Sequence, residues 1–231
     1  LKFIKSTIFV TSDKCYQSNN STLGFKENDK LGGIDPYSGS KACAEIIVKT
    51  YYESFFKDKI KNGIATARAG NVIGGGDWSK DRLIPDAIRS LNKKKTIIIR
   101  NPNFNRPWQH VLEPLRGYLI LGLKLYKNPI KFSGAWNFGT ERNTVNNVKQ
   151  VISKIILNWG NGKYQVENKK KFYEQTNLQL NISKAKREIN WSPKFSIDEC
   201  IEFTVEWYIE VLRKKNNVYN VTKSQILKYM E

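Results

Sequence analysis

The sequence predicts an α/β protein whose sheet is built from parallel strands. An apolar run at Thr7–Val10 is typical of a buried strand of such a sheet. A helical segment follows at about Tyr37–Phe56, and a second strand at Gly63–Arg68 ends before a glycine-rich turn. A strand, a helix and a strand in this order predict a right-handed parallel crossover.

Helical spacing supports the segment between these two strands. Pro36 suits the first turn of a helix, because a backbone N–H at that position has no partner within the helix. Apolar residues recur on one side, which is the face that we expect to be buried: Ala44, Ile47, Val48, Tyr51 and Phe55.

The rest of the chain alternates further helices with short strands. Helical spacing recurs in four more segments: about Leu83–Asn92, Leu112–Tyr126, Asn143–Trp159 and Ile197–Leu212. Short strands are expected at Thr96–Arg100 and within Gly134–Gly139. The helix at 112–126 fits a return of the chain to the main sheet.

The composition sets bounds on the class of protein. With 231 residues, of which 40% are hydrophobic, the chain can form one domain and part of a second. No apolar run approaches the length of a membrane span, and no secretory signal is visible. The three cysteines, Cys15, Cys43 and Cys200, are widely spaced, so we expect a reducing cytoplasm and neither a disulfide framework nor a metal site. We expect Cys15 to be a small buried apolar residue.

The net charge of +18 also allows a basic nucleic-acid-binding module. The lysines, however, form short scattered runs, which are typical of a solvated surface. Aromatic residues interleaved with basic ones on a single face are not evident. Nucleic-acid binding is therefore a remote alternative.

Two short stretches carry the expected chemistry. Ser12, Asp13 and Lys14 follow the first strand, and ligands of open α/β sheets bind beyond the carboxyl ends of the strands. Tyr37 and Lys41 are four residues apart, so they share one face of the expected helix. An ammonium near a phenol stabilises the phenolate, which can act as a general base toward a sugar hydroxyl.

Longer strings around these residues resemble a known family. The strings are Val10–Tyr16, Asp35–Lys41, Arg68–Trp78, Arg82–Asp86 and Arg106–Val111. In this order they resemble the extended short-chain dehydrogenase/reductase family, and within it the CDP-glucose 4,6-dehydratases, as far as about residue 208. The resemblance implies a partial NAD(P)-binding Rossmann domain, which is a doubly wound parallel sheet, and a smaller C-terminal α/β substrate domain.

The resemblance also implies domain boundaries. Residues 1–76, with contributions from about 107–140, would form the C-terminal part of the Rossmann domain, and residues 77–106 and 141–213 the substrate-binding domain. Residues 214–231 lie beyond the resemblance and receive no role. Because the sequence contains no Gly-x-Gly-x-x-Gly phosphate loop, we expect it to lack the N-terminal NAD-binding part and to be inactive alone.

The reaction that the resemblance implies is that of a hydro-lyase. NAD oxidises carbon 4 of CDP-glucose, water is eliminated across carbons 5 and 6, and the hydride returns to carbon 6. The product is CDP-4-keto-6-deoxyglucose, a precursor of the deoxysugars of lipopolysaccharide O-antigens. Tyr37 would be the base at the carbon-4 hydroxyl, Lys41 would assist it and hold the nicotinamide ribose, and Ser12 would hydrogen-bond the same oxygen.

Lys14 and Asp13 would perform the elimination. Lys14 stands where related dehydratases have a glutamate, and it would remove the carbon-5 proton. Asp13 would protonate the departing hydroxyl, because a neighbouring acid and base separate the two proton roles. Each residue also has a simpler interpretation: Asp13 could cap a turn, Lys14 could be solvated, and Tyr37 with Lys41 could be an accidental helix pair.

Substrate contacts are expected further along the chain. Asn71 resembles a sugar-diphosphate contact, and Arg106 resembles the arginine that clamps the diphosphate. Arg82 is a weaker phosphate candidate, since an ion pair with Asp77 or Asp86 would explain it equally well. We expect three further residues to pack or hydrogen-bond within the fold rather than react: Trp108, His110 and Trp136.

Two other enzymatic interpretations stay open. A nucleotide-sugar 4-epimerase would need Tyr37 and Lys41 but not Asp13 and Lys14. The other alternative is a dehydratase of another nucleotide sugar. For the complete enzyme we expect a homodimer in the cytoplasm that binds neither a membrane nor nucleic acid.

Overall fold

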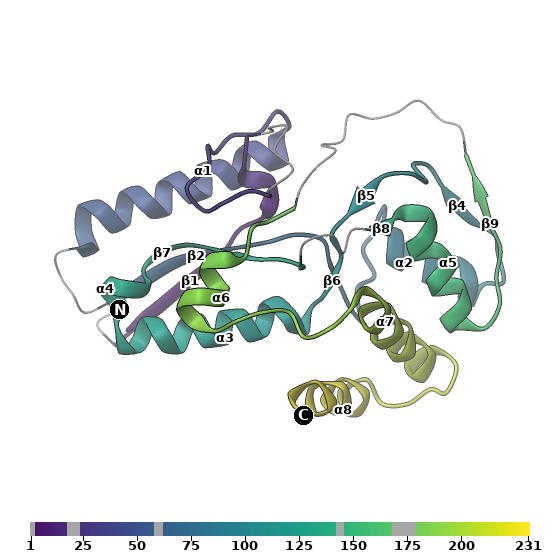
Figure 1. The fold of residues 1–231 in the computed structure, drawn as a ribbon. Helices are drawn as coiled ribbons and strands as arrows, with labels where there is room; N and C mark the ends of the chain where they lie inside the picture. The colour runs from purple at the N-terminus through teal and green to yellow at the C-terminus, as the bar shows by residue number, and fades with distance from the viewer. Residues whose placement is uncertain (1–2, 18–23, 58–61, 142–145, 168–178) are drawn as a thin grey trace. The chain divides into compact units, whose positions relative to one another are not determined.

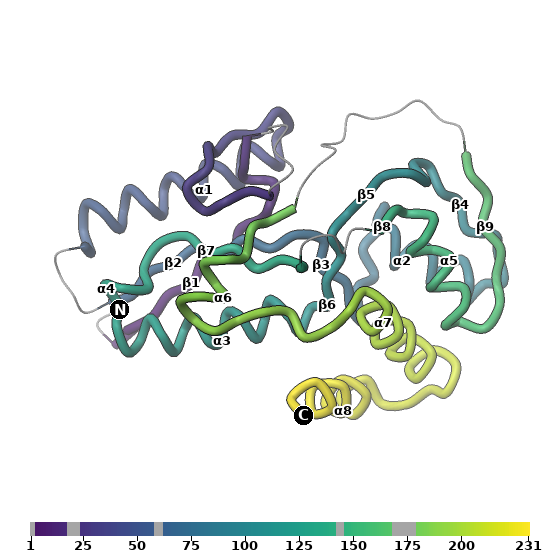
Figure 2. The backbone as a smooth tube through the Cα atoms, in the orientation of Figure 1, coloured from purple at the N-terminus to yellow at the C-terminus, as the bar shows by residue number. Residues whose placement is uncertain are grey.

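The computed structural model describes residues 3–17, 24–57, 62–141, 146–167 and 179–231. The chain divides into two compact units. The first comprises Leu1–Gly70, Glu113–Asn143 and Asn177–Lys194, and the second comprises Asn71–Leu112, Thr144–Thr176 and Phe195–Glu231. Figures 1 and 2 show the elements of each unit.

The first unit contains a parallel sheet of three strands. Its order is β1 (Ser6–Val10), β2 (Gly63–Ala69) and β7 (Gly134–Phe138). The helix α1 (Pro36–Tyr51) connects β1 to β2, so the expected parallel crossover is confirmed. The strand β2 is buried along its whole length, whereas the last two residues of β1, Phe9 and Val10, are exposed. The expectation that β1 is a fully buried strand was therefore wrong.

The helix α1 presents the opposite face to the one that hydropathy predicts. Its fully buried residues are Ser38, Ala42 and Glu45. In the expected inner stripe, Ile47, Tyr51 and Phe55 are each more than half exposed, and the last of them belongs to a π-helical turn, Tyr52–Phe56, that continues α1. The correction has a physical reason: the inner face lies against a charged residue of β2, so it requires small and polar side chains.

The other face of the sheet is covered by α3 (Leu112–Lys127), as Figure 1 shows. This side of the unit is an apolar core, and its fully buried large side chains include Leu121, Leu125 and Trp136. The helix α6 (Ser183–Ile189) adds Ile189 to the same core, and Trp191 follows it. Residues 179–194 therefore belong to the unit of the parallel sheet, whereas the sequence analysis assigned them to the substrate domain.

The second unit is built mainly from helices. Three helices share its core: α2 (Leu83–Asn92), α5 (Val148–Trp159) and α7 (Ile197–Leu212). The short strands pair as β3 (Val72–Ile73) with β6 (Gln109–His110), β4 (Ile97–Ile99) with β9 (Tyr164–Val166), and β5 (Asn105–Arg106) with β8 (Asn146–Asn147). The expected start of α5 at 143–145 lies outside the described residues, and the helix begins after a capping box at Asn147.

The segment without an expected role forms a last helix, α8 (Val218–Met230). It packs on α7, where the Trp207 indole donates to the Thr222 hydroxyl (2.9 Å) and the Gln225 amide donates to the Phe203 carbonyl (2.7 Å). None of the described helices has the length and apolarity that crossing a bilayer requires.

Trp207, which lies on α7 and bonds α8, leaves no room for a side chain at one position of the Gly74–Gly76 turn. A Cβ atom on Gly75 would lie 2.0 Å from Cγ of Trp207. We expect Gly75→Ala to lower the free energy of unfolding by about 1–3 kcal/mol, because Trp207 must leave its site. The matched change Gly39→Ala meets nothing within 4 Å and replaces a helical glycine, so it is expected to stabilise slightly. Denaturant unfolding of both variants checks this, and equal stabilities would contradict the packing described.

Candidate functional site

The end of β1 is followed at once by a short 3-10 turn, Asp13–Cys15. Ser12 caps this turn: its Oγ accepts a hydrogen bond from the Lys14 backbone N–H (3.2 Å) and donates one to Oδ1 of Asp13 (3.0 Å). Ser12 and Asp13 are both buried, and Lys14 is partly exposed. The capping role that the sequence analysis considered for Asp13 is thus taken by Ser12.

The start of α1 carries the second pair of candidate residues. Asp35 caps the helix by accepting from the Ser38 backbone N–H (3.0 Å) and hydroxyl (2.5 Å), and these bonds lower the pKa of its carboxyl. Tyr37 follows with its ring half exposed. The ammonium groups of Lys14 and Lys41 each lie 5.7 Å from the centre of that ring. The structure therefore brings Lys14, from the turn after β1, and Lys41, from α1, to one phenol.

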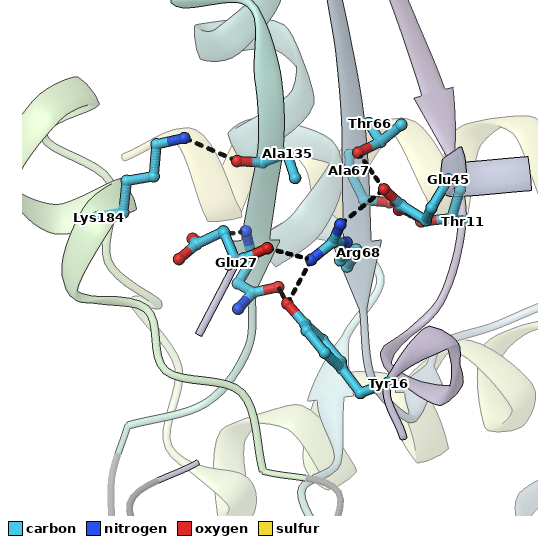
Figure 3. A network of polar contacts seen from close by, with 10 residues as sticks. Thr11, Tyr16, Glu27, Glu45, Thr66, Ala67, Arg68, Ala135 and Lys184 are labelled. Atoms are coloured by element: carbon cyan, nitrogen blue, oxygen red, sulfur yellow. Dashed lines mark hydrogen bonds and ion pairs between the residues drawn. The ribbon is translucent and has the colours of Figure 1, made fainter. Parts of the chain in front are cut away.

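A buried ion pair lies one helical turn beyond Lys41 (Figure 3). Oε2 of Glu45 accepts from Nη2 of Arg68 on β2 (2.7 Å) and from the Thr66 hydroxyl (2.7 Å). Its other oxygen accepts from the Thr11 hydroxyl, directly before Ser12. Burial opposes ionisation of Glu45, but the bonds and the charge of Arg68 outweigh it and lower the pKa of the carboxyl. Glu45 is therefore a carboxylate in a nearly dry site.

The arginine extends this network to the far end of the turn (Figure 3). Nη1 of Arg68 donates to the Tyr16 hydroxyl (2.7 Å) and to the Glu27 carbonyl (2.9 Å). The Tyr16 hydroxyl in turn donates to Oδ1 of Asn137 (2.7 Å), and burial raises the pKa of this phenol. Tyr16 is thus held as a neutral donor.

Cys15, the last residue of the turn, lies in a small apolar cluster. Its side chain is fully buried with Tyr16, Phe25 and Leu180, and burial raises the pKa of its thiol to about 12. A thiol of this kind is not a nucleophile at neutral pH. The interpretation of Cys15 as a small buried residue is confirmed.

The three candidate substrate contacts all lie in the second unit. The Asn71 carbonyl accepts from the Gln109 N–H (3.0 Å) beside the β3–β6 pair. Arg106, on β5, is buried, and its Nη1 donates to the Asn105 carbonyl (3.0 Å). Arg82 is exposed and lies 3.9 Å from Asp77, so the ion pair considered as its alternative role is present.

His110 and the tryptophans pack within the fold, as expected. Nδ1 of His110 accepts from the Leu112 backbone N–H (3.3 Å), and its ring makes edge contacts with Phe195 and Phe203. Trp108 and Trp136 are both buried in cores. These three residues therefore stabilise the two units.

His110 gives the stability of the second unit a pH dependence. Burial lowers its pKa from 6.5 to about 4, so the unfolded chain binds a proton there that the folded chain does not. Stability from the neutral ring is complete above pH 6.5 and is lost as the pH falls toward 4, by at most about 3 kcal/mol. We expect His110→Asn, which keeps an acceptor for Leu112, to flatten this slope in urea unfolding at several pH values. An unchanged slope would exclude His110 as the cause.

Sequence reasoning missed Glu45, Tyr16 and Asn137 as parts of the site. One signal was available: Glu45 follows Lys41 by four residues and Tyr37 by eight, so the three share a face of the helix. Tyr16 and Asn137 are 121 residues apart, and no local pattern joins them.

The parallel sheet and the Tyr-x-x-x-Lys helix agree with the Rossmann-type fold that the resemblance to extended short-chain dehydrogenases/reductases implies. A solved dTDP-glucose 4,6-dehydratase from Bacillus anthracis in complex with NAD has a TM-score of 0.74 and 24% identity, and the match covers 88% of this chain and 61% of that one. A UDP-glucuronic acid 4-epimerase from Bacillus cereus has a TM-score of 0.73 and 18% identity, covering 91% and 64%. These likenesses confirm the predicted fold.

The chain belongs to the GDP-mannose 4,6 dehydratase family, whose model matches residues 4–204. It is 40% identical to the CDP-glucose 4,6-dehydratase of Salmonella typhimurium over 98% of this chain and 64% of the relative. It is 25% identical to the dTDP-D-glucose 4,6-dehydratase of Homo sapiens over 93% and 59%. The chain thus spans less than two thirds of the length of these relatives.

Proposed function

We propose that this chain carries the catalytic and substrate-binding residues of an NAD-dependent CDP-glucose 4,6-dehydratase. The observation that carries the proposal is the pair of ammonium groups, Lys14 and Lys41, each 5.7 Å from the centre of the Tyr37 ring. One lysine beside the phenol serves oxidation of a sugar hydroxyl, and a second lysine adjoining an acid serves an elimination. The 40% identity to the Salmonella relative supports CDP-glucose as the substrate.

In the first step, Tyr37 accepts the proton of the carbon-4 hydroxyl. The Lys41 ammonium stabilises the phenolate that this step needs. Ser12 exchanges its hydrogen bond to Asp13 for one to the same sugar oxygen. Tyr37 and Lys41 would hold NAD, since both face the same side of α1 and Tyr37 is half exposed. The bound cofactor would supply the redox chemistry, which is removal of a hydride at carbon 4 and its return at carbon 6.

In the second step, the new ketone acidifies the proton on carbon 5. Lys14 in its amine form removes this proton, and Asp13 in its acid form protonates the hydroxyl that leaves carbon 6 as water. The Lys14 ammonium exchanges its protons with solvent, and it then donates a proton to carbon 5 when the hydride reaches carbon 6. A base and an acid next to each other in one turn can act on neighbouring carbons of one ring.

Further parts of the proposal concern the complete enzyme. Asn71 and Arg106 would bind the diphosphate, with Arg82 in a lesser role, and a glycine-rich N-terminal segment would bind NAD. A homodimer would cover the exposed apolar residues of α1, among them Ile47 and Tyr51. The buried free thiols of Cys15 and Cys200 support a location in the reducing cytoplasm.

Activity toward a panel of nucleotide sugars tests the proposal. The chain would be assayed as it is and joined to the NAD-binding segment of the Salmonella relative, which we call the completed enzyme. With NAD and CDP-glucose, the alkaline absorbance of a 4-keto sugar is expected, and weaker signals with dTDP-, UDP- and GDP-sugars. An epimerised sugar would favour the 4-epimerase instead, and salt-sensitive retention of oligonucleotides without any sugar product would favour the nucleic-acid module.

A further inference from the structure

We infer that the buried Glu45–Arg68 pair is a positioning device that sets Lys14 and Lys41 against Tyr37. The inference rests on the proposed function only for the catalytic roles of Lys14, Tyr37 and Lys41. Its basis is that one ion pair touches both segments that carry them, as Figure 3 shows for Thr11, Glu45, Arg68 and Tyr16. Neither member of the pair is a catalytic residue in this account.

The first contact fixes the helix. Tyr37, Lys41 and Glu45 follow one another at intervals of four, so they form one line along α1. Glu45 ends that line in the ion pair with Arg68 (2.7 Å), and the pair is almost fully buried. Since β2 is buried throughout and central in its sheet, Arg68 is a rigid anchor, and α1 can neither rotate nor slide without breaking the bond.

The second set of contacts fixes the turn. The residue before Ser12 is Thr11, whose hydroxyl donates to Glu45, and the residue that ends the turn is Tyr16, whose hydroxyl accepts from Arg68 (2.7 Å). The turn with Asp13 and Lys14 is therefore tied at both ends to the same two charges. Loss of either charge would release helix and turn together.

A buried ion pair is a weak device for stability alone, because desolvation offsets most of its attraction. A well-packed apolar pair would hold α1 on β2 equally well. An apolar pair could not, however, also bind the Thr11 and Tyr16 hydroxyls, which carry the position of the turn. The choice of charged residues is thus explained by the contacts that they make to the turn.

The test reads the surroundings of Tyr37 directly in the chain as it is. A 3-fluorotyrosine placed at position 37 reports the two ammonium groups through its ¹⁹F resonance, calibrated with Lys14→Gln and Lys41→Gln. We expect Glu45→Gln to shift or broaden this resonance toward the calibration variants. Glu53→Gln is the matched control, since it removes the same charge from an exposed pair with Lys57 on the adjoining turn. The control should leave the resonance unchanged.

A second, milder variant covers the possibility that Glu45→Gln unfolds. Thr11→Val keeps both charges of the ion pair and removes the hydroxyl that donates to Glu45 and lies 3.5 Å from the Ala67 carbonyl. It should shift the resonance in the same direction. In the completed enzyme both variants should lower kcat by about 10- to 100-fold with little change in KM. A folded variant with an unshifted ¹⁹F resonance would overturn the inference. If the completed enzyme lacks dehydratase activity altogether, the proposed function fails, and the ¹⁹F result still decides the positioning role.

Discussion

Replacement of Tyr37 by phenylalanine is expected to lower kcat of the completed enzyme by about 100- to 10,000-fold. The ring would stay beside the ammonium groups of Lys14 and Lys41, so binding of the nucleotide sugar, and with it KM, should change little. Only the hydroxyl that we propose as the acceptor of the carbon-4 proton is lost. Initial rates of 4-keto sugar formation, measured over a range of CDP-glucose concentrations, check both parts of this expectation.

Tyr51→Phe is the matched control for this prediction. Tyr51 lies on the same helix, is exposed and makes a tilted ring contact with Phe55, and it has no part in the proposed chemistry. The Tyr51→Phe change also removes one hydroxyl, and it should leave kcat and KM unchanged. A Tyr37→Phe enzyme with nearly normal kcat would assign the base role to another group.

Lys14→Gln is expected to stop the reaction between oxidation and elimination. This change removes the base that we propose for the carbon-5 proton, so product formation should fall by about 100- to 10,000-fold. Tyr37 and Lys41 remain, so oxidation at carbon 4 should continue for one turnover. Rapid-quench analysis in heavy water checks this: solvent deuterium should be absent from carbon 5, and up to one equivalent of reduced cofactor should accumulate.

Lys49→Gln removes the same charge from an exposed position of α1 and serves as the control. It should neither slow product formation nor prevent deuterium uptake. If Lys14→Gln instead abolishes oxidation as well, Lys14 acts with Lys41 on Tyr37 alone. The separate role in elimination would then be wrong.

Local sequence patterns predicted the bounds of helices better than the contacts that the helices make in the fold. The bounds of α2 and α7 match the expected segments, because strong amphipathic spacing defined both, and the Ser196–Glu199 capping box starts the latter. The weakly amphipathic α8 was not predicted, and the Thr222 and Gln225 contacts that hold it depend on α7. The position of α8 is therefore determined by tertiary contacts with α7.

The buried face of α1 shows why hydropathy alone is insufficient. The pattern of Ile47, Tyr51 and Phe55 indicated a buried stripe. The helix instead buries Glu45, because Glu45 forms an ion pair with Arg68 on β2. For the candidate site, spacing placed Tyr37 and Lys41 on one face, and the strand-end rule placed Lys14 near them. The network that joins them links Thr11 and Arg68 through Glu45. Short stretches of sequence cannot predict contacts between residues so far apart in the chain.

The fate of a carbon-bound label tests the central claim most directly. That claim is that the turn after β1 and the start of α1 act together on one hexose to remove water. The completed enzyme would be given CDP-glucose deuterated at carbon 4. The account predicts a 4-keto-6-deoxy product with this deuterium on carbon 6 and a solvent proton on carbon 5. A sugar that keeps its carbon-6 hydroxyl, with the deuterium still on an inverted carbon 4, would contradict it.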